Sequence, residues 1–299
     1  MEALLSLAFD NLSSYDGPKI RKGLRQVEGL LAQICLSNSS SGRTRSSSLS
    51  SSAVGHDDGD DDASGNAPRK DLAQLTQDPA FREFFKLQEG FEWNVAMRLT
   101  STLDRLMAKG SDGQNDLLIL SALDLIQGVM LLHPPSKALF AREQNMNLLL
   151  DLLEPYNCPA IQSATLLTLV VALIDTPNNT RTFEGLDGLL TVTSLFKSRS
   201  TSREVKLKLV EFLYFYLMPE TPSSPRADHR ESVFQQRSPS KLSGAFGADG
   251  RSARKRANSN GVVTLTTAEK QQLLSRHLSS VEDLVKDLRT CAPFGGIVC

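Results

Sequence analysis

The stretch LLILSALDLIQGVMLL occupies residues 117–132, and related apolar runs return at residues 160–174 (AIQSATLLTLVVALI) and 205–218 (VKLKLVEFLYFYLM). A proline follows each run, at intervals of 42 residues: Pro135, Pro177 and Pro219. Apolar residues in these runs recur at helical spacing, and proline cannot continue a helix. The sequence therefore predicts three helices, each closed by a proline.

A second, shorter helix is expected to follow each of the first two prolines. A polar turn leads to Phe140 or Phe183, and leucine-rich segments then cover residues 147–153 and 188–196. A period of ~40–47 residues with helices in each unit is typical of armadillo and HEAT repeats. The predicted fold is therefore all-α, an armadillo/HEAT-like stack in which neighbouring units share one core. The run 160–174 is apolar on nearly every side, which predicts a helix between two layers.

Two segments interrupt this pattern. Residues 37–70 are rich in serine and then aspartate, and residues 220–264 carry many Ser, Pro, Gly and Arg residues. Such compositions bury too little apolar surface to offset the entropy of ordering, so two disordered inserts are predicted. The expected organisation of the chain is a single domain with these parts: N-terminal helices at 1–36, an insert at 37–70, helical repeats at 71–219, an insert at 220–264, and a capping helix at 265–292.

Both inserts contain candidate phosphorylation sites. Ser46 follows two arginines, Ser238 precedes a proline in the string SPSK, and Ser259 follows the basic cluster 254–256. A phosphate would add about −1.5 to −2 charge and could create or remove a docking contact. Chance matches are frequent in serine-rich tracts, and the basic cluster also fits a nuclear address.

The last predicted helix begins with a capping box formed by Thr266 and Glu269. An apolar stripe then runs from Leu273 to Leu288 without interruption. A terminal layer of a helical stack exposes apolar surface unless something covers it. We expect this helix to pack on the layer with residues 212–216, although binding a partner helix is the alternative.

Composition excludes several classes of function. The 299 residues carry a formal net charge of −1, which gives no indication of nucleic-acid binding. Four scattered cysteines without a CxxC pair indicate a reduced compartment, so a cytoplasmic protein is expected. No apolar run reaches the ~18 uncharged residues of a membrane span.

Motifs of catalysis and cofactor binding are missing from the sequence. It contains no nucleotide-binding glycine loop, no HExxH and no GxSxG, and no pair of His or Cys residues has metal-ligand spacing. Cys158 lacks the flanking residues that a phosphate-binding cysteine loop needs. We therefore predict no catalytic site, no cofactor, no metal and no small-molecule substrate. A hydrolase would require catalytic residues to converge from distant positions.

Candidate partner-binding residues lie in the turns between the paired helices. They are Arg142, Asn145, Asn178, Asn179 and Arg181. Polar side chains in such turns also cap the following helix, so capping explains the last three equally well. A basic face with Lys19, Arg21, Lys22 and Arg25 either steers an acidic partner or is simply solvated.

Several strings resemble a known family. These are residues 1–36, GFEWNV at 90–95, LLHPPS at 131–136, AREQNMN at 141–147 and EFLYFYLMPE at 211–220. They are similar to the fungal septation initiation network scaffold called cell division control protein fourteen, which shares only its name with a dual-specificity phosphatase. The resemblance covers nearly all of the chain outside the two inserts.

This resemblance implies a non-catalytic subunit that binds a Ste20-like, germinal-centre-type serine/threonine kinase and supports its activity. It also implies a role in septum formation and cytokinesis, with recruitment to the spindle pole body during mitosis. The family offers no short site motif, so no interface residue follows from it. The alternative is a general armadillo-type adaptor that binds extended peptides without a kinase partner.

Overall fold

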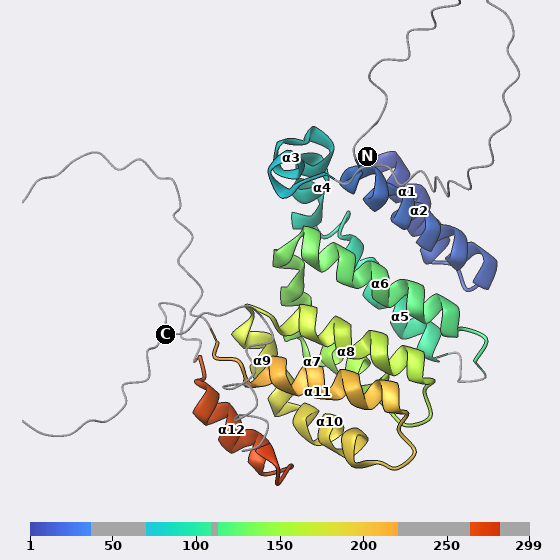
Figure 1. Cartoon of the computed structure of the whole chain (residues 1–299). Helices are drawn as coiled ribbons and strands as arrows, with labels where there is room; N and C mark the ends of the chain where they lie inside the picture. Colours follow the sequence, from blue (N-terminus) through green and yellow to red (C-terminus); the bar gives the residue numbers. More distant parts are fainter. Residues whose placement is uncertain (37–69, 109–112, 221–263, 282–299) are drawn as a thin grey trace, which may run out of the picture.

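The computed structural model describes residues 1–36, 70–108, 113–220 and 264–281. Within these ranges the chain forms helices and no β-strand, which confirms the all-α prediction (Figure 1). The helices are α1 (Glu2–Leu12), α2 (Gly17–Cys35), α3 (Leu72–Gln77), α4 (Pro79–Glu89), α5 (Val95–Ala108), α6 (Asp116–Leu132), the 3₁₀ helix η1 (Pro134–Ala141), α7 (Glu143–Asp151), α8 (Pro159–Leu173), α9 (Pro177–Gly185), α10 (Gly188–Lys197), α11 (Arg203–Leu217) and α12 (Thr267–Ser275).

The three long apolar helices end where the prolines predict. Helix α6 ends before Pro134, α8 ends before Pro177, and α11 ends before Pro219. Pro177 then occupies the first turn of α9, where its missing N–H group costs no hydrogen bond. Proline therefore both stops one helix and starts the next turn of the chain.

The three long apolar helices lie side by side in the order α6, α8 and α11, and α2 lies beside α6 at the start of this row (Figure 1). Helix α8 packs against α6 on one side and α11 on the other, which confirms the prediction of a helix between two layers. Leu166, Leu169 and Ala172 of α8 are each at most 1% exposed. A hydrogen bond from Gln127 Nε2 to Thr168 Oγ1, 3.0 Å long, joins α6 and α8 inside the stack. The armadillo/HEAT assignment of this stack stays a prediction.

Two phenylalanines occupy matching places after the first two prolines. Phe140 in η1 and Phe183 in α9 are both 0% exposed. The ring of Phe183 lies over Gly188, at the first turn of α10, so closely that a Cβ there would be 2.3 Å from the ring. Gly188 is thus required by the packing of α9 on α10.

Helix α1 packs on α2 through a close backbone approach at Gly23. A Cβ at Gly23 would lie 2.9 Å from the backbone nitrogen of Leu12, whereas a Cβ at Gly29 meets nothing within 4 Å. We expect Gly23→Ala to lower the free energy of unfolding by about 1–3 kcal/mol, because α1 and α2 must separate. We expect Gly29→Ala, in the same helix, to raise it by about 0.5–1 kcal/mol. Urea unfolding of both variants tests this pair, and equal effects would contradict the close approach.

Helix α12 packs against α11, as predicted, and begins with the predicted capping box. Lys270 Nζ lies 5.2 Å from the centre of the Tyr216 ring and donates a 3.0 Å hydrogen bond to the carbonyl oxygen of Met218. The prediction of one helix over residues 265–292 is wrong at residues 276–280, because α12 ends at Ser275; Val281 is helical again, and residues 282–292 lie outside the described residues. Two consecutive serines at 279–280 lie in a turn, and serine competes with the backbone for hydrogen bonds in a helix.

Both predicted inserts lie almost wholly outside the described residues, but their ends are described. Lys70 donates from its backbone nitrogen to the carbonyl oxygen of Cys35 (2.9 Å) and from its side chain to that of Ile34 (2.9 Å). Glu220 donates from its backbone nitrogen to the carbonyl oxygen of Leu265 (3.1 Å). Each insert therefore leaves and rejoins the helical body at one point.

Among the described helices, none has the combination of length and apolar composition that spanning a bilayer requires.

Candidate partner-binding site

One edge of the stack is formed by the turns that follow the long helices. Asn179 Nδ2 donates to the carbonyl oxygen of Lys137 (2.8 Å), and Thr182 Oγ1 donates to that of Ala141 (3.2 Å). These bonds join α9 to η1, the equivalent segment of the preceding layer. Successive turns are therefore fixed to one another along this edge.

A network of charged side chains continues this edge from α9 to α11 and α12. Arg181 pairs with Glu184 (Nη1 to Oε2, 3.0 Å) and with Glu220. Lys270 Nζ lies 3.2 Å from Oε1 of Glu220, and the Tyr216 hydroxyl donates a 2.7 Å hydrogen bond to Glu184. The Glu220 and Lys270 side chains are only 8% and 6% exposed. We call these five residues the Glu220 cluster.

The Glu220 cluster also holds the chain where it returns from the second insert. The backbone nitrogen of Leu265 donates to Oε2 of Glu220 (2.9 Å). One carboxylate thus contacts α9 through Arg181, α12 through Lys270 and the segment before α12 through Leu265. Two cations and two carboxylates balance within the cluster, as buried charges require.

Burial dominates the electrostatics of this cluster. It raises the pKa of Glu184, against the opposing effects of the Tyr216 hydroxyl and of Arg181. Burial, with the neighbouring carboxylate of Glu184, raises the pKa of Tyr216. Burial lowers the pKa of Lys270, although Glu220 opposes this change. Burial disfavours the charged forms of Glu184 and Lys270, so their charges depend on the neighbouring opposite charges of the cluster.

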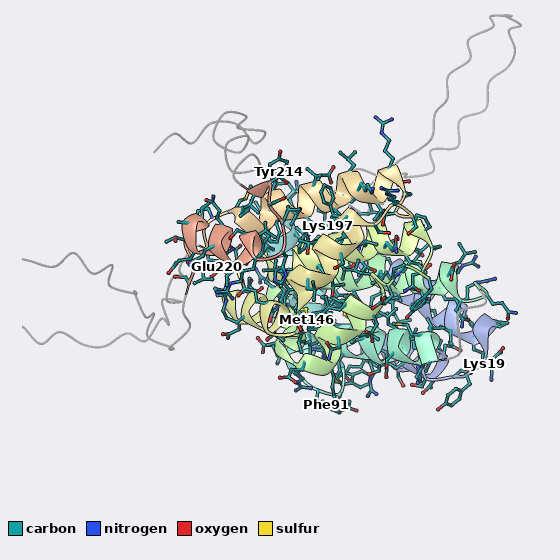
Figure 2. All side chains as sticks on the ribbon, turned by 90° about the horizontal axis from the view of Figure 1, so that it is seen from below. Lys19, Phe91, Met146, Lys197, Tyr214 and Glu220 are labelled. Carbon is teal, nitrogen blue, oxygen red and sulfur yellow. The ribbon has the colours of Figure 1, made fainter. Side chains whose placement is uncertain are left out.

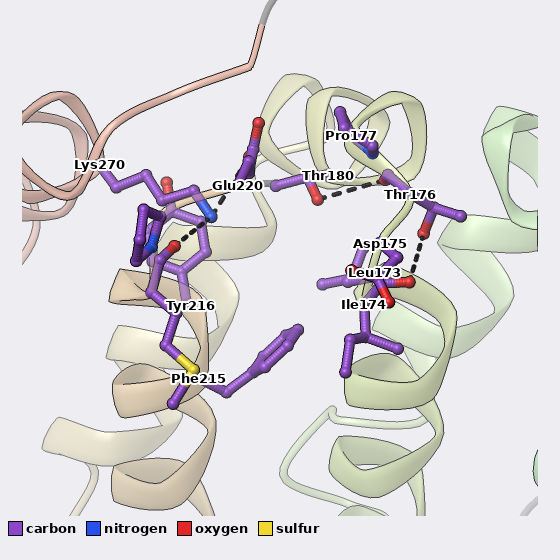
Figure 3. A pocket seen from close by; sticks show the side chains of 12 residues that line it. Leu173, Ile174, Asp175, Thr176, Pro177, Thr180, Phe215, Tyr216, Glu220 and Lys270 are labelled. Atoms are coloured by element: carbon purple, nitrogen blue, oxygen red, sulfur yellow. Dashed lines mark hydrogen bonds and ion pairs between the residues drawn. The ribbon is translucent and has the colours of Figure 1, made fainter. Parts of the chain in front are cut away.

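A cavity of about 230 Å³ lies beside the Glu220 cluster. Figure 3 shows Lys270, Glu220 and Tyr216 along one wall and the end of α8 with the start of α9 along the other. Ile174 and Met218, which line it, are 40% and 38% exposed. The cavity thus offers apolar surface next to a buried charged group, an arrangement that fits an apolar side chain of a partner protein.

The structure brings the five predicted partner-binding residues to this edge, but not all of them are accessible. Arg142 and Asn178 are exposed, and Arg181 belongs to the Glu220 cluster. Asn145 is half-buried and donates a 2.7 Å hydrogen bond to the carbonyl oxygen of Leu139. Asn179 is 1% exposed and cannot contact a partner, because its side chain holds two backbone carbonyl groups.

Asn179 and its neighbour Asn178 give a matched test of this assignment. Asn179→Ala leaves the carbonyl groups of Lys137 and Ala172 without their 2.8 Å and 2.7 Å hydrogen bonds. We expect a loss of about 1–3 kcal/mol in the free energy of unfolding, because the Lys137 carbonyl lies in the interior, whereas the Ala172 carbonyl keeps its 2.6 Å hydrogen bond from Thr176 Oγ1. Asn178→Ala, at an exposed position, is expected to change it by less than about 0.5 kcal/mol. Urea unfolding measures both, and similar small effects would refute the structural role of Asn179.

Little in the sequence indicates the Glu220 cluster. Glu184, the pair Tyr216 and Glu220, and Lys270 come from three separate segments, and no motif links them. The one usable signal was the capping box, which correctly located α12 and so placed Lys270 in a helix. The candidate phosphorylation sites Ser46, Ser238 and Ser259 all lie outside the described residues.

The described residues contain no group of three or more His, Cys, Asp or Glu side chains placed to hold a metal ion.

Comparison with protein families gives a match over residues 1–294 to the family described as Cell division control protein 14, SIN component. The chain belongs to this family. SIN denotes the septation initiation network, so the Cell division control protein 14 family member described here is related to proteins of cell division. This family is distinct from the phosphatase of the same name, and the resemblance stated from the sequence is confirmed.

A curated relative of this Cell division control protein 14 family member is Cell division control protein 14 of Schizosaccharomyces pombe. The two are 28% identical over 303 residues, which cover 99% of this chain and 97% of the relative. No solved structure matches the chain. The aligned span includes both inserts and the α12 segment. The family match and this relative together support a role in the septation initiation network.

Proposed function

We propose that this chain is a non-catalytic regulatory scaffold of the septation initiation network. It binds a Ste20-like, germinal-centre-type serine/threonine kinase, supports its activity and so controls septum formation and cytokinesis. The observation that carries the proposal is the match to a SIN component family over residues 1–294. The scaffold acts by favouring the active arrangement of a kinase that binds it.

The edge with the Glu220 cluster is the surface we propose for the kinase. It carries the exposed side chains of Arg142 and Asn178, a cavity with apolar rim residues, and turns that hydrogen bonds fix to each other. A fixed surface loses little conformational entropy on binding, which favours affinity. The exposed cationic side chain of Arg142 on this edge would steer an acidic region of the kinase.

The test measures binding and phosphorylation together. The full chain is mixed with a purified Ste20-like kinase, and complex formation and kinase activity are measured with and without the chain. We expect a complex at micromolar concentration and higher activity with the chain present. No complex at that concentration would contradict the proposal.

A charge reversal on the edge locates the interface. We expect Arg142→Glu combined with Asn178→Glu to weaken the complex by about tenfold or more, since several exposed contacts are lost or become repulsive. Arg203→Glu, at an exposed position at the start of α11, serves as the control and is expected to leave affinity unchanged. Equal losses in both variants would place the kinase elsewhere.

The same proposal includes a cytoplasmic location, with recruitment to the spindle pole body during mitosis. A fluorescent fusion followed through the cell cycle tests it, and an even distribution at every stage would contradict the recruitment.

A general peptide adaptor is the second candidate function, and one observation favours it. Each of the three long apolar helices exposes leucine: Leu117 and Leu131 on α6, Leu167 on α8 and Leu207 on α11 are 53–69% exposed. Exposed leucines on three neighbouring helices offer apolar contacts to an extended peptide. Binding of unrelated apolar peptides in the absence of any kinase would favour the adaptor over the kinase scaffold.

A further inference from the structure

A second concave surface lies between α2 and α6, away from the Glu220 cluster. The groove has a volume of about 490 Å³. Figure 2 shows Lys19 of α2 and Glu220 at opposite ends of the molecule. A partner in this groove would therefore not compete with one at the edge described above.

The floor of the groove is apolar, and its rim includes an exposed leucine. Leu24, Leu118 and Leu125 line it and are 2%, 5% and 9% exposed, so they belong to the core and give the groove a fixed floor. Leu117, at the start of α6, is 69% exposed and contributes apolar surface to the rim. The groove thus provides both a rigid base and an unburied apolar side chain.

Charged side chains divide the groove into a basic and an acidic end. Helices α2 and α6 lie side by side with Leu31 over Gly128, and Glu28 faces Asp124 one turn earlier. Burial, and then the nearby charge of Glu28, raises the pKa of Asp124. Arg21 and Arg25 line the groove toward the start of α2.

These charges are available to a partner. None of the ion pairs found in the described part of the chain involves Arg21, Arg25, Glu28 or Asp124. All four residues are exposed, although neighbouring atoms partly cover the Asp124 carboxyl group. The two carboxylates repel each other, and a cation between them would relieve this repulsion.

We propose that the α2–α6 groove binds one amphipathic helix of another protein. Its apolar side chains lie on the leucine floor, an acidic side chain faces Arg21 and Arg25, and a lysine or arginine faces Glu28 and Asp124. Arg21 and Glu28 are separated by seven residues of helix, about 10 Å, so the partner's opposite charges lie about two turns apart. This surface lies beyond the kinase-binding edge and requires no kinase.

The occupant follows from shape and charge. Two copies of a concave surface cannot fill each other, which argues against a symmetric pair of grooves. A uniformly acidic or basic helix would place like charges at one end, and like-charge contacts are unfavourable. A helix with an apolar face and two opposite charges places a favourable charge at both the basic and the acidic end of the groove.

The experiment uses three synthetic helical peptides with the same leucine face and the full chain. One peptide carries Glu and Lys two turns apart, one carries Glu at both positions, and one carries Lys at both. Fluorescence anisotropy measures each dissociation constant. We expect the mixed-charge peptide to bind about tenfold more tightly than either uniform peptide.

Charge reversals on the protein give the decisive comparison. Arg21→Glu with Arg25→Glu makes the groove acidic throughout, and its preference is expected to change to the all-Lys peptide. Glu28→Lys with Asp124→Lys makes it basic throughout, and the all-Glu peptide is expected to become the best ligand. Lys19→Glu with Lys22→Glu changes the charge of α2 by the same amount as the first pair, and is expected to keep the original preference.

Circular dichroism of each variant verifies that the exposed substitutions leave the fold intact. The proposal is overturned if all three peptides bind equally, or if the groove variants and the Lys19/Lys22 control behave alike. It is also overturned if sedimentation shows a dimer of the unmodified chain that Glu28→Lys with Asp124→Lys abolishes, since the groove would then hold a second copy.

Discussion

Replacement of Glu220 by alanine is expected to release α12 from the helical body. The change removes the acceptor that holds Arg181, Lys270 and the Leu265 backbone, and it leaves Lys270 buried without a carboxylate. Breaking a buried ion pair in this way costs about 3–5 kcal/mol. Detachment of α12 avoids this cost, so we expect amide hydrogen exchange at residues 267–275 to become at least about 100-fold faster.

The control for this prediction is Glu211→Ala, in α11, the helix that precedes Glu220. Glu211 forms an ion pair with Lys208 in which both side chains are about half exposed, at 54% and 43%. Exposed pairs contribute about 0–1 kcal/mol, so exchange in α12 should stay unchanged. Protection of α12 in the Glu220→Ala protein equal to that of the control would mean that apolar contacts alone hold this helix.

The second large effect is expected at Phe212, in the interior between α9 and α11. Its ring centre lies 5.7 Å from that of Phe183, in an edge-on arrangement, and 6.2 Å from that of Phe215. Phe212 is 1% exposed. We expect Phe212→Ala to lower the free energy of unfolding by about 3–5 kcal/mol, through lost burial and the cavity left behind.

Phe91 provides the matched control, because it is the same residue type at 77% exposure (Figure 2). Phe91→Ala is expected to change the free energy of unfolding by less than about 0.5 kcal/mol. Urea unfolding followed by circular dichroism compares the two. A loss at Phe212 below about 1 kcal/mol would show that the layers around α11 can collapse into the space.

The helices that make up the stack could be predicted from the sequence, because the signals that define them lie within each helix and just after it. Apolar spacing and proline act over a few residues, so the positions of α6, α8 and α11 followed directly. The extent of α12 could not be predicted by the same argument. The apolar stripe continues past Ser275 and predicts a longer helix. The two consecutive serines at 279–280 are a weaker signal, yet they lie in the turn that interrupts it.

The candidate site was only partly predictable, because it depends on contacts between distant segments. Arg142 and Asn178 were placed on an exposed edge from their position in inter-helix turns. The structure places Asn178 and Asn179 at the start of α9 and not in a loop, and the neighbouring layer decides whether a polar side chain there points outward or bonds a backbone group. Asn179 points inward for this reason, and the ion pair of Glu220 with Lys270 joins segments on either side of the second insert.

The fixed ends of the inserts have a practical consequence for protein engineering. Since the backbones of Lys70 and Cys35 meet at 2.9 Å, and those of Glu220 and Leu265 at 3.1 Å, a short turn can replace either intervening segment without stretching the body. The entropy of closing a loop changes only slowly with its length, so a fluorescent domain or an affinity tag should also fit at either position. These two junctions are therefore natural places for trimming or labelling the chain.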